Sequence, residues 1–213
     1  MRCSRIAFAV VVSAACSSTT EPNRPGVVPA GVDDPTWAII DKTCTPSSPV
    51  TAISRARLDS APPLTHGPSR TVDDEWADIA RQVPGGYAGV ILENGVPVIF
   101  LVDTTQRQAA LAGLQGRLNV PGLANAKVRA ARWNFAQLAE WYRYLQVQPF
   151  GAQISSSDID EAKNRITFGA PDSTSRAKIA QSLAKLDLPC YLVGIEQRGF
   201  AMLTATRPRN GTE

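Results

Sequence analysis

From residue 71 onward, apolar residues recur at the spacing of amphipathic helices and then of strands. Trp76, Ile79 and Val83 are three to four positions apart, which is the spacing of one helix face. Thr71 and the three acids that follow it favour a first helical turn, because they satisfy free N–H groups and the helix dipole. Pro84-Gly85-Gly86 ends the periodicity. We therefore predict a helix between these two signals.

Two apolar runs, 87–92 and 96–102, lie on either side of Glu93-Asn94-Gly95. Asn-Gly between apolar runs is the strongest short-range signal for a β-hairpin, because both residues tolerate positive φ. We therefore predict a pair of strands joined by a tight turn. Pro97 cannot donate a ladder hydrogen bond, so it should lie at the start of its strand or at a sheet edge.

A second helix and a third strand complete this unit, and the same order of elements then repeats. Thr104 or Thr105 is the expected cap of the second helix, which runs to about Leu118. Residues 127–133 form the expected third strand. The repeat has a helix capped by Asn134, two strands, a helix and a strand, at about residues 135–146, 154–159, 165–169, 173–186 and 190–195.

This repeat predicts an α+β fold of tandem helix-strand-strand-helix-strand subdomains. Each subdomain should be a small antiparallel or mixed sheet covered by helices. The first spans residues 71–133, the second residues 134–205, and a tail follows at 206–213.

The chain before residue 71 has a different texture. Residues 17–70 hold nine of the sixteen prolines, which favour an extended, semi-rigid chain. We therefore expect residues 16–70 to form a tether. Two apolar groups within it, 37–40 and 50–53, are the parts expected to dock onto the folded domain.

The first residues have the parts of a secretory signal. Arg2 and Arg5 precede an uncharged apolar run, 6–12, which is too short to cross a bilayer as a mature helix. Ser13-Ala14-Ala15-Cys16 follows and resembles the lipobox of bacterial lipoproteins, whose cysteine carries the lipid. The resemblance implies a signal peptide at residues 1–15 and a bilayer anchor at acylated Cys16. An ordinary cleaved signal with an incidental cysteine is the alternative.

Ser17, rather than aspartate, follows this cysteine, and the resemblance then implies sorting to the outer membrane where a bacterium has one. Cleavage leaves 213 − 15 = 198 residues and lowers the formal charge from +3 to +1, because Arg2 and Arg5 are removed. The basicity of the chain therefore belongs largely to its export signal. An overall electrostatic case for nucleic acid fails.

A local excess of cations remains between residues 104 and 147. Six basic residues face only Glu140 there: Arg107, Arg117, Lys127, Arg129, Arg132 and Arg143. Gly113-Leu114-Gln115-Gly116 is similar to the loop by which KH domains clamp RNA. Export argues against RNA, and glycines at a helix end explain the motif, so we expect no nucleic-acid partner. Anionic lipid head groups are the stronger alternative.

The cysteines and the single histidine limit the chemistry. Cys44 and Cys190 remain after processing, and an even pair in an oxidising compartment predicts a disulfide. His66 is alone in the tether and there is no G-x-S-x-G motif, so we expect no catalytic residue. Without a close cysteine pair, no metal site and no cofactor are expected.

Three segments resemble one bacterial family. The hairpin 87–103, the segment 128–138 and the turn-containing segment 159–169 are similar to pro-regions of secreted serine proteases of the α-lytic protease and streptogrisin type. The most specific piece is the acidic turn that ends in Asn164-Arg165. In those proteases the module acts as a folding chaperone and tight inhibitor. The resemblance therefore implies a protein-binding lipoprotein, with a secreted protease or another envelope protein as its partner. A structural envelope lipoprotein and an unrecognised hydrolase are the alternatives.

Candidate binding residues lie in two places. Trp141 and Tyr144 point away from the expected buried face of their helix, so they either pack against the neighbouring half or form an exposed patch. Phe200, Met202, Arg207 and Arg209 follow the last strand, where the resembling pro-regions contact their protease. Residues 200–206 could instead add a fourth strand. The strands 127–133 and 190–195 are expected to leave open sheet edges for β-augmentation.

The anchor gives the first testable prediction. The mature protein should begin at Cys16 and carry lipid, because the apolar run ends in a lipobox-like sequence. Intact-mass analysis of protein purified from its native envelope measures this. An unmodified amino terminus at another residue would contradict the anchor while leaving export intact.

Overall fold

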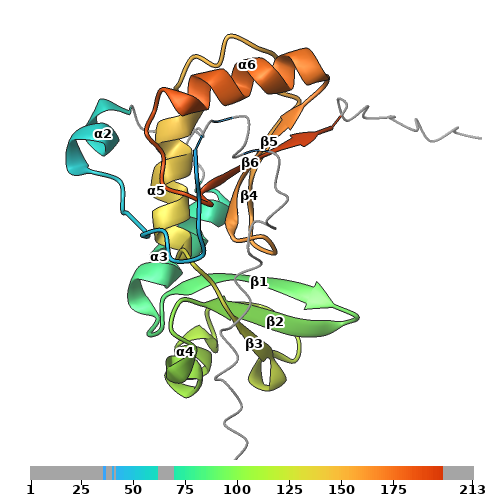
Figure 1. Cartoon of the computed structure of the whole chain (residues 1–213). Helices are drawn as coiled ribbons and strands as arrows, with labels where there is room; N and C mark the ends of the chain where they lie inside the picture. Colours follow the sequence, from blue (N-terminus) through green and yellow to red (C-terminus); the bar gives the residue numbers. More distant parts are fainter. Residues whose placement is uncertain (1–35, 37–39, 41, 62–69, 199–213) are drawn as a thin grey trace, which may run out of the picture.

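The structure is a computed structural model that describes residues 36, 40, 42–61 and 70–198 (Figure 1). The predicted signal peptide, Cys16, His66 and the tail residues Phe200, Met202, Arg207 and Arg209 lie outside the described residues.

The first subdomain has the predicted order of elements. They are α3 (Val72–Gln82), β1 (Tyr87–Glu93), β2 (Val96–Leu101), η1 (Thr104–Gln106), α4 (Arg107–Leu114), η2 (Leu123–Asn125) and β3 (Lys127–Ala130). The three strands form one sheet in the order β1-β2-β3. β1 and β2 are antiparallel, whereas β2 and β3 are parallel.

The second subdomain repeats this topology. Its elements are α5 (Phe135–Gln146), β4 (Ser156–Asp160), β5 (Arg165–Ala170), α6 (Ser173–Ala184) and β6 (Val193–Gln197). The sheet order is β4-β5-β6, with an antiparallel pair followed by a parallel pair. The predicted α+β fold of tandem subdomains with small mixed sheets is therefore confirmed.

Side-chain caps begin the longer helices where the sequence predicts them. Thr71 and Asp74 form a capping box at α3, and Asn134 and Gln137 form another at α5. Asp172 caps α6 by accepting a hydrogen bond from the backbone N–H of Ser175. Each cap satisfies N–H groups that the first helical turn leaves without an intrahelical partner.

The hairpin of the first sheet also agrees with its sequence signal. Asn94 and Gly95 have φ angles of 51° and 78°, as a two-residue turn of this type requires. Pro97 is the second residue of β2, and pairing with β3 begins only at Val98. Its missing N–H therefore costs no hydrogen bond to β3.

Several element boundaries differ from the prediction. Asp103, rather than a threonine, caps the turn before α4, and α4 ends at Leu114, ahead of Gly116 with its φ of 77°. β3 stops at Ala130 instead of residue 133: the N–H of Ala131 still bonds to the carbonyl of Leu101, but those of Arg132 and Trp133 bond to the side chain of Asn164 in the second subdomain. β6 starts at Val193, after Tyr191 takes a φ of 67° that interrupts the strand.

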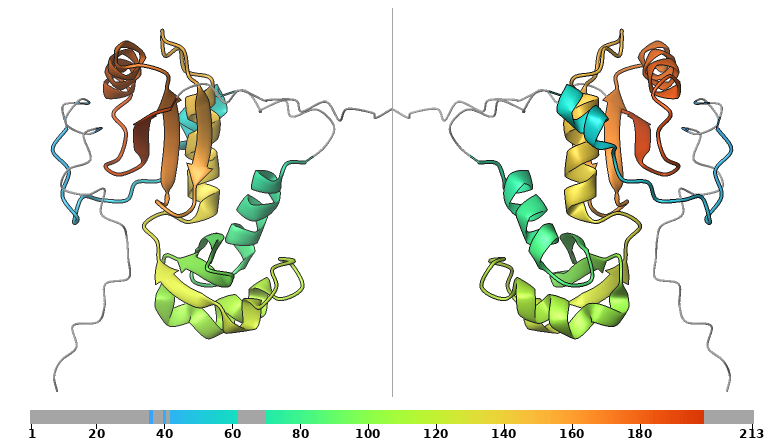
Figure 2. Two further views of the ribbon diagram at one scale, coloured as in Figure 1. Left: turned by 90° about the vertical axis from the view of Figure 1, so that its right-hand side faces the viewer. Right: turned by 90° about the vertical axis from the view of Figure 1, so that its left-hand side faces the viewer.

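One hydrophobic core runs through both subdomains. Trp76 of α3 meets Tyr87 of β1 and Phe135 of α5 edge-to-face, with ring centroids 6.2 and 5.4 Å apart. α5 also contacts β4 and β5, so this helix belongs to both halves of the core. Figure 2 shows it standing beside the second sheet, with α3 inclined next to its lower end.

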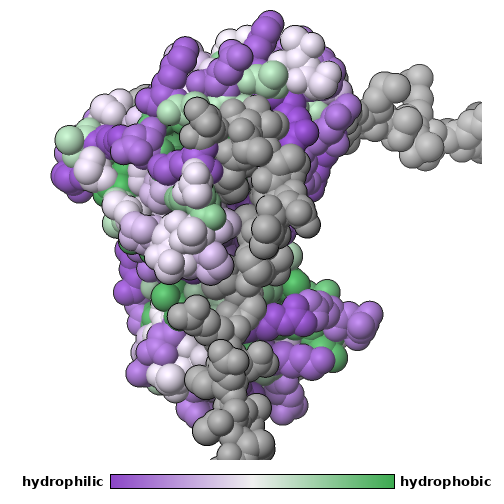
Figure 3. All heavy atoms as spheres, in the orientation of Figure 1, coloured by the Kyte–Doolittle hydropathy of each residue, from purple (hydrophilic) through white to green (hydrophobic). Residues whose placement is uncertain are grey.

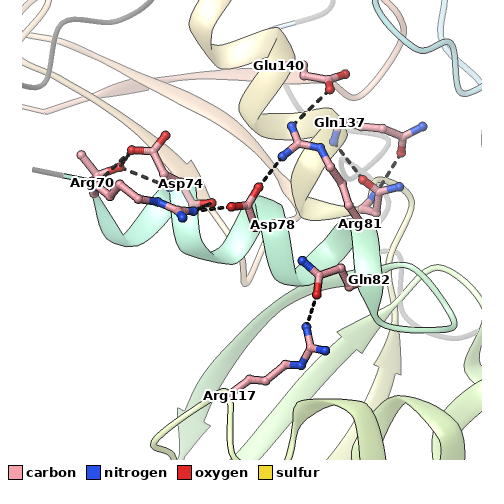
Figure 4. A network of polar contacts seen from close by, with 10 residues as sticks. Arg70, Asp74, Asp78, Arg81, Gln82, Arg117, Gln137 and Glu140 are labelled. Atoms are coloured by element: carbon pink, nitrogen blue, oxygen red, sulfur yellow. Dashed lines mark hydrogen bonds and ion pairs between the residues drawn. The ribbon is translucent and has the colours of Figure 1, made fainter.

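Polar contacts on the outer face of α3 connect it to both subdomains (Figure 4). Arg81 pairs with Asp78 at 2.9 Å and with Glu140 of α5 at 3.4 Å. Arg117 donates a hydrogen bond to the side chain of Gln82. Because Arg81 and Glu140 are 49% and 32% exposed, their ion pair contributes about 0–1 kcal/mol.

Residues 42–61, which we call the strap, pack onto the second subdomain. The prediction that residues 16–70 form a tether is wrong for this part, because the strap contains α2 (Arg55–Ser60) and buries Ile53 and Ala61. One residue of each apolar group predicted to dock, Ile40 and Ile53, is buried, whereas Val50 is 42% exposed.

Cys44 and Cys190 form the predicted disulfide, with their Cα atoms 5.6 Å apart and 146 residues between them in sequence. It joins the strap to the chain just ahead of β6. Beside it, the Lys42 ammonium donates to the backbone carbonyl of Leu188 at 2.5 Å. The strap is thus held covalently at one end.

The two subdomains join at Arg132–Asn134, and Asn164 of the β4–β5 turn holds this junction. Its Oδ1 accepts the backbone N–H groups of Arg132 at 2.7 Å and of Trp133 at 2.8 Å. Its Nδ2 donates to the carbonyl of Trp133 at 2.9 Å. Asn164 has a φ of 49° and is 7% exposed. A side-chain amide therefore pairs with the chain where β3 would otherwise continue.

Replacing this amide should destabilise the protein. Asn164→Gly keeps the left-handed turn but leaves buried N–H groups without acceptors, so we expect a loss of about 2–4 kcal/mol in the free energy of unfolding. Urea denaturation measures it. Asn94→Gly is the matched control, because Asn94 has a similar φ in an exposed turn. This substitution should change the free energy of unfolding by only a small fraction of the loss expected for Asn164→Gly. Equal effects of the two substitutions would contradict a role for the amide.

Candidate protein-binding surfaces

Trp141 and Tyr144, the predicted aromatic binding residues, are only 2% and 9% exposed. The indole N–H of Trp141 donates to the carbonyl of Thr51 in the strap at 3.2 Å. The guanidinium of Arg57, also in the strap, lies 5.8 Å from the Trp141 ring and 6.0 Å from the Tyr144 ring. The two rings therefore form no exposed patch. They pack, but against the strap rather than against the other subdomain.

The cations between residues 104 and 147 are mostly engaged within the chain. Arg129 forms a bidentate ion pair with Glu93, and Arg107 donates to the carbonyl of Ala126. Arg132 and Arg143 donate to backbone carbonyls of the strap. Each of these four guanidinium groups therefore has a partner within the described residues.

The sheet edges are the next candidates, and β1 has the most open one. Glu93 and Val96 close the two-residue hairpin, so Glu93 and every second residue before it bond to β2. The N–H and C=O groups of Val90 and Leu92 therefore point away from the sheet. Within the described part of the chain, these groups take part in no hydrogen bond. Leu92 is also 63% exposed, and Figure 3 shows hydrophobic and polar side chains together over this hairpin.

The other three edges carry features that discourage pairing with a foreign strand. β4 has Asp158 and Asp160. On β6, the outward N–H of Ile195 is already accepted by the hydroxyl of Thr36 at 3.1 Å. β3 is only four residues long and begins with Lys127. Of the two edges predicted from the sequence, each is thus short or partly satisfied, and β1 takes their place as the candidate.

An acidic side chain lies where the second subdomain touches β1. A Cβ placed on Gly89 would be 2.6 Å from Cγ of Glu161, and Gly89 has a φ of 132°, so only glycine fits this contact. Burial, and after it the charges of the nearby Asp158, Asp160 and Asp73, raise the pKa of Glu161 to about 7. Glu161 is therefore partly protonated near neutral pH.

Tyr87 lies close to this carboxyl group. Its side chain is fully buried, and its hydroxyl has no hydrogen-bond partner in the described residues. Burial, and then the charge of Glu161, raise the pKa of this hydroxyl far above its usual range. The phenol therefore stays protonated, which suits packing rather than proton transfer.

Sequence reasoning did not predict the roles of three residues that organise these surfaces: Asn164, Arg132 and Glu161. The hairpin that contains Asn164 and Glu161 was recognisable as the most specific of the family-like segments. Its acids and asparagine are residues that favour turns, so the sequence explains them by the turn alone. Nothing in the local pattern indicates which distant strand the turn contacts. Among the residues that the structure describes, no cluster of His, Cys, Asp and Glu is arranged to hold a metal.

No protein-family model, curated protein or solved structure matches this chain. The resemblance to protease pro-regions therefore stays a prediction that rests on its three segments. None of the described helices is both long enough and apolar enough to cross a bilayer.

The raised pKa of Glu161 gives a pH dependence with a defined sign. The folded-state value of about 7 exceeds the reference value of 4.5, so the folded state binds this proton more tightly. This contribution to stability is complete below about pH 4.5 and is lost as the pH rises through about 7.

Urea denaturation across this pH range should show that step in the wild-type protein. Glu161→Gln, which keeps the neutral form at all pH values, should remove it and be more stable than wild type at about pH 8. Glu75→Gln, at an exposed position of α3, is the control and should keep the wild-type profile. A step that persists in Glu161→Gln would assign it to another group.

Proposed function

We propose that this chain is an exported envelope protein, anchored by lipid at Cys16, that binds another protein by β-augmentation at the β1 edge. The observation that carries the proposal is the exposed edge at Val90 and Leu92, whose main-chain groups have no partner within the described residues. An incoming extended segment satisfies such groups with its own main chain.

The disulfide supports the compartment. Cys44 and Cys190 are joined across the fold, and disulfides persist mainly in extracellular, periplasmic and similar oxidising surroundings. The export signal and lipobox-like sequence at the amino terminus agree with this. An outer-membrane location in a two-membrane bacterium is part of the same proposal.

The class of partner comes from the resemblance. Pro-regions of α-lytic-type proteases bind their enzyme as inhibitors and folding helpers, and the repeated α+β topology is compatible with such a module. We therefore propose a secreted serine protease as the partner. The tail residues Phe200, Met202, Arg207 and Arg209 are the second proposed contact.

A charge at the open edge tests the proposal. Leu92→Lys should weaken capture of an α-lytic-type protease by about tenfold or more, because lysine on an edge strand opposes pairing with another chain. The melting temperature should stay almost unchanged, since Leu92 is largely exposed. Val147→Lys, just beyond α5, is the control and should bind like wild type. Surface plasmon resonance with immobilised protease measures both.

A second arm of this experiment truncates the chain after Arg198, whose backbone N–H bonds to the carbonyl of Ala170 and is kept for that reason. Loss of capture at an unchanged melting temperature supports the tail contact. Loss of folding assigns the tail a structural role. Wild-type protein that captures no protease would favour the structural-lipoprotein alternative.

A further inference from the structure

Besides the disulfide and the burial of Ile53 and Ala61, five hydrogen bonds hold the strap through its own backbone carbonyls. Arg132 donates to the carbonyls of Pro46 and Ser48, the first at 3.1 Å. Trp141 donates to that of Thr51, and Arg143 donates to those of Leu58 and Ala61 at 3.2 and 3.0 Å. Every polypeptide offers such carbonyls. These five hydrogen bonds therefore do not depend on the side chains of the strap.

The surface under the strap has the composition of a peptide-binding groove. Trp141 and Tyr144 lie edge-to-face with ring centroids 6.0 Å apart, between the donors Arg132 and Arg143. Aromatic rings with a few convergent donors are the means by which grooves bind extended, proline-containing chains. Trp, Tyr and Arg are also the residues that contribute most at protein interfaces.

The segment that occupies this surface has the matching conformation. Residues 49–54 form no helix, strand or turn, and Ser54 has φ −69° and ψ 148°, which is the polyproline II region. Pro46 and Pro49 lie just ahead of the carbonyl that Trp141 binds. Arg57 then places its guanidinium over both rings. The occupant is therefore extended only at residues 49–54, after a turn at Pro46 and ahead of α2, the helix in which Arg57 lies.

At Trp141 the strap leaves an open groove of about 590 Å³, which is lined by Pro49, Arg57, Trp141 and Cys190 among others. This volume lies in the range that proteins use for ligands, about 300–1,000 Å³. Cys44, at the same rim, is partly exposed, and exposed disulfides are the ones that thiols attack.

We propose that Arg132, Trp141, Arg143 and Tyr144 form a binding groove for a segment of another polypeptide that is extended after a proline and continues into a cationic helix, with the strap as its intramolecular occupant. The Cys44–Cys190 disulfide keeps the strap in place, because this second covalent connection raises the effective concentration of the strap at the groove. A dithiol opens this lock. It transfers two electrons and two protons to the disulfide, which becomes two thiols, while the dithiol becomes a disulfide.

This groove is separate from the β1 edge, so the two proposals fail independently. The test uses the full-length protein and a fluorescent peptide with the sequence of residues 45–61, read by fluorescence anisotropy. The oxidised protein should not bind the peptide. The protein reduced with dithiothreitol, and Cys44→Ser/Cys190→Ser, should bind it about tenfold or more tightly than the oxidised form, because the competing strap is no longer locked.

Variants in the reduced background identify the groove. Arg143→Ala should weaken peptide binding about tenfold, because two carbonyl contacts are lost. Arg117→Ala removes the same charge far from the strap and should leave binding unchanged, as should Leu92→Lys at the β1 edge. Circular dichroism confirms that each protein is folded. A folded, reduced protein that does not bind the peptide overturns the proposal.

A variant with the disulfide intact covers the case in which reduction unfolds the protein. Arg57→Ala loosens the strap by removing its contact with both rings, while the groove residues stay in place. This oxidised variant should bind the peptide more tightly than wild type, and unchanged binding overturns the proposal. Elution of the reduced protein as a dimer that excludes the peptide also overturns it, because a second copy is then the occupant.

Discussion

The side-chain amide of Asn164 takes the place of a neighbouring strand at the point where the two subdomains meet. Its Oδ1 accepts hydrogen bonds from the N–H groups of Arg132 and Trp133, and its Nδ2 donates to the carbonyl of Trp133. Because Asn164 sits in a left-handed turn at the tip of the β4–β5 hairpin, these bonds place that tip against the end of β3. Much of the remaining structure follows from this placement. Trp133 enters the core, Asn134 begins α5, and the Arg132 side chain reaches the strap.

The same hairpin tip carries an opposing electrostatic effect. Glu161 lies against the glycine of the β1 bulge, and its carboxyl group is shielded from water beside three aspartates. Ionisation there costs free energy that the hydrogen bonds of Asn164, three residues further on, must outweigh. The contact between the subdomains therefore combines the hydrogen bonds of Asn164, which do not depend on pH, with the carboxyl group of Glu161, whose charge does. Below neutral pH Glu161 is mostly protonated, so it no longer opposes the contact between the hairpin tip and β1.

The two candidate binding surfaces, the β1 edge and the aromatic surface of α5, differ in whether other parts of the chain cover them. Within the described residues, the outward main-chain groups of β1 at Val90 and Leu92 have no hydrogen-bond partner. The aromatic surface of α5 is closed, because the strap covers it and the disulfide holds the strap. Both proposed binding modes use main-chain groups for recognition. An open edge offers N–H and C=O groups to a partner, whereas the α5 surface offers side-chain donors to a partner's carbonyls.

Helices, turns and hairpins that depend on contacts within a few residues could be predicted from the sequence. Asn134 caps a helix and Asn94-Gly95 turns a hairpin because the deciding contacts lie within a few residues. The repeated order of these elements then predicted the tandem α+β topology, and the count of cysteines predicted the disulfide. Tertiary structure alone decided which faces are covered. The indole N–H of Trp141 donates to the carbonyl of Thr51, 90 residues away in sequence, and Arg132 donates to the carbonyl of Pro46, 86 residues away. Periodicity predicts on which face of its helix a side chain lies. Which segment covers that face depends on the packing of the whole chain.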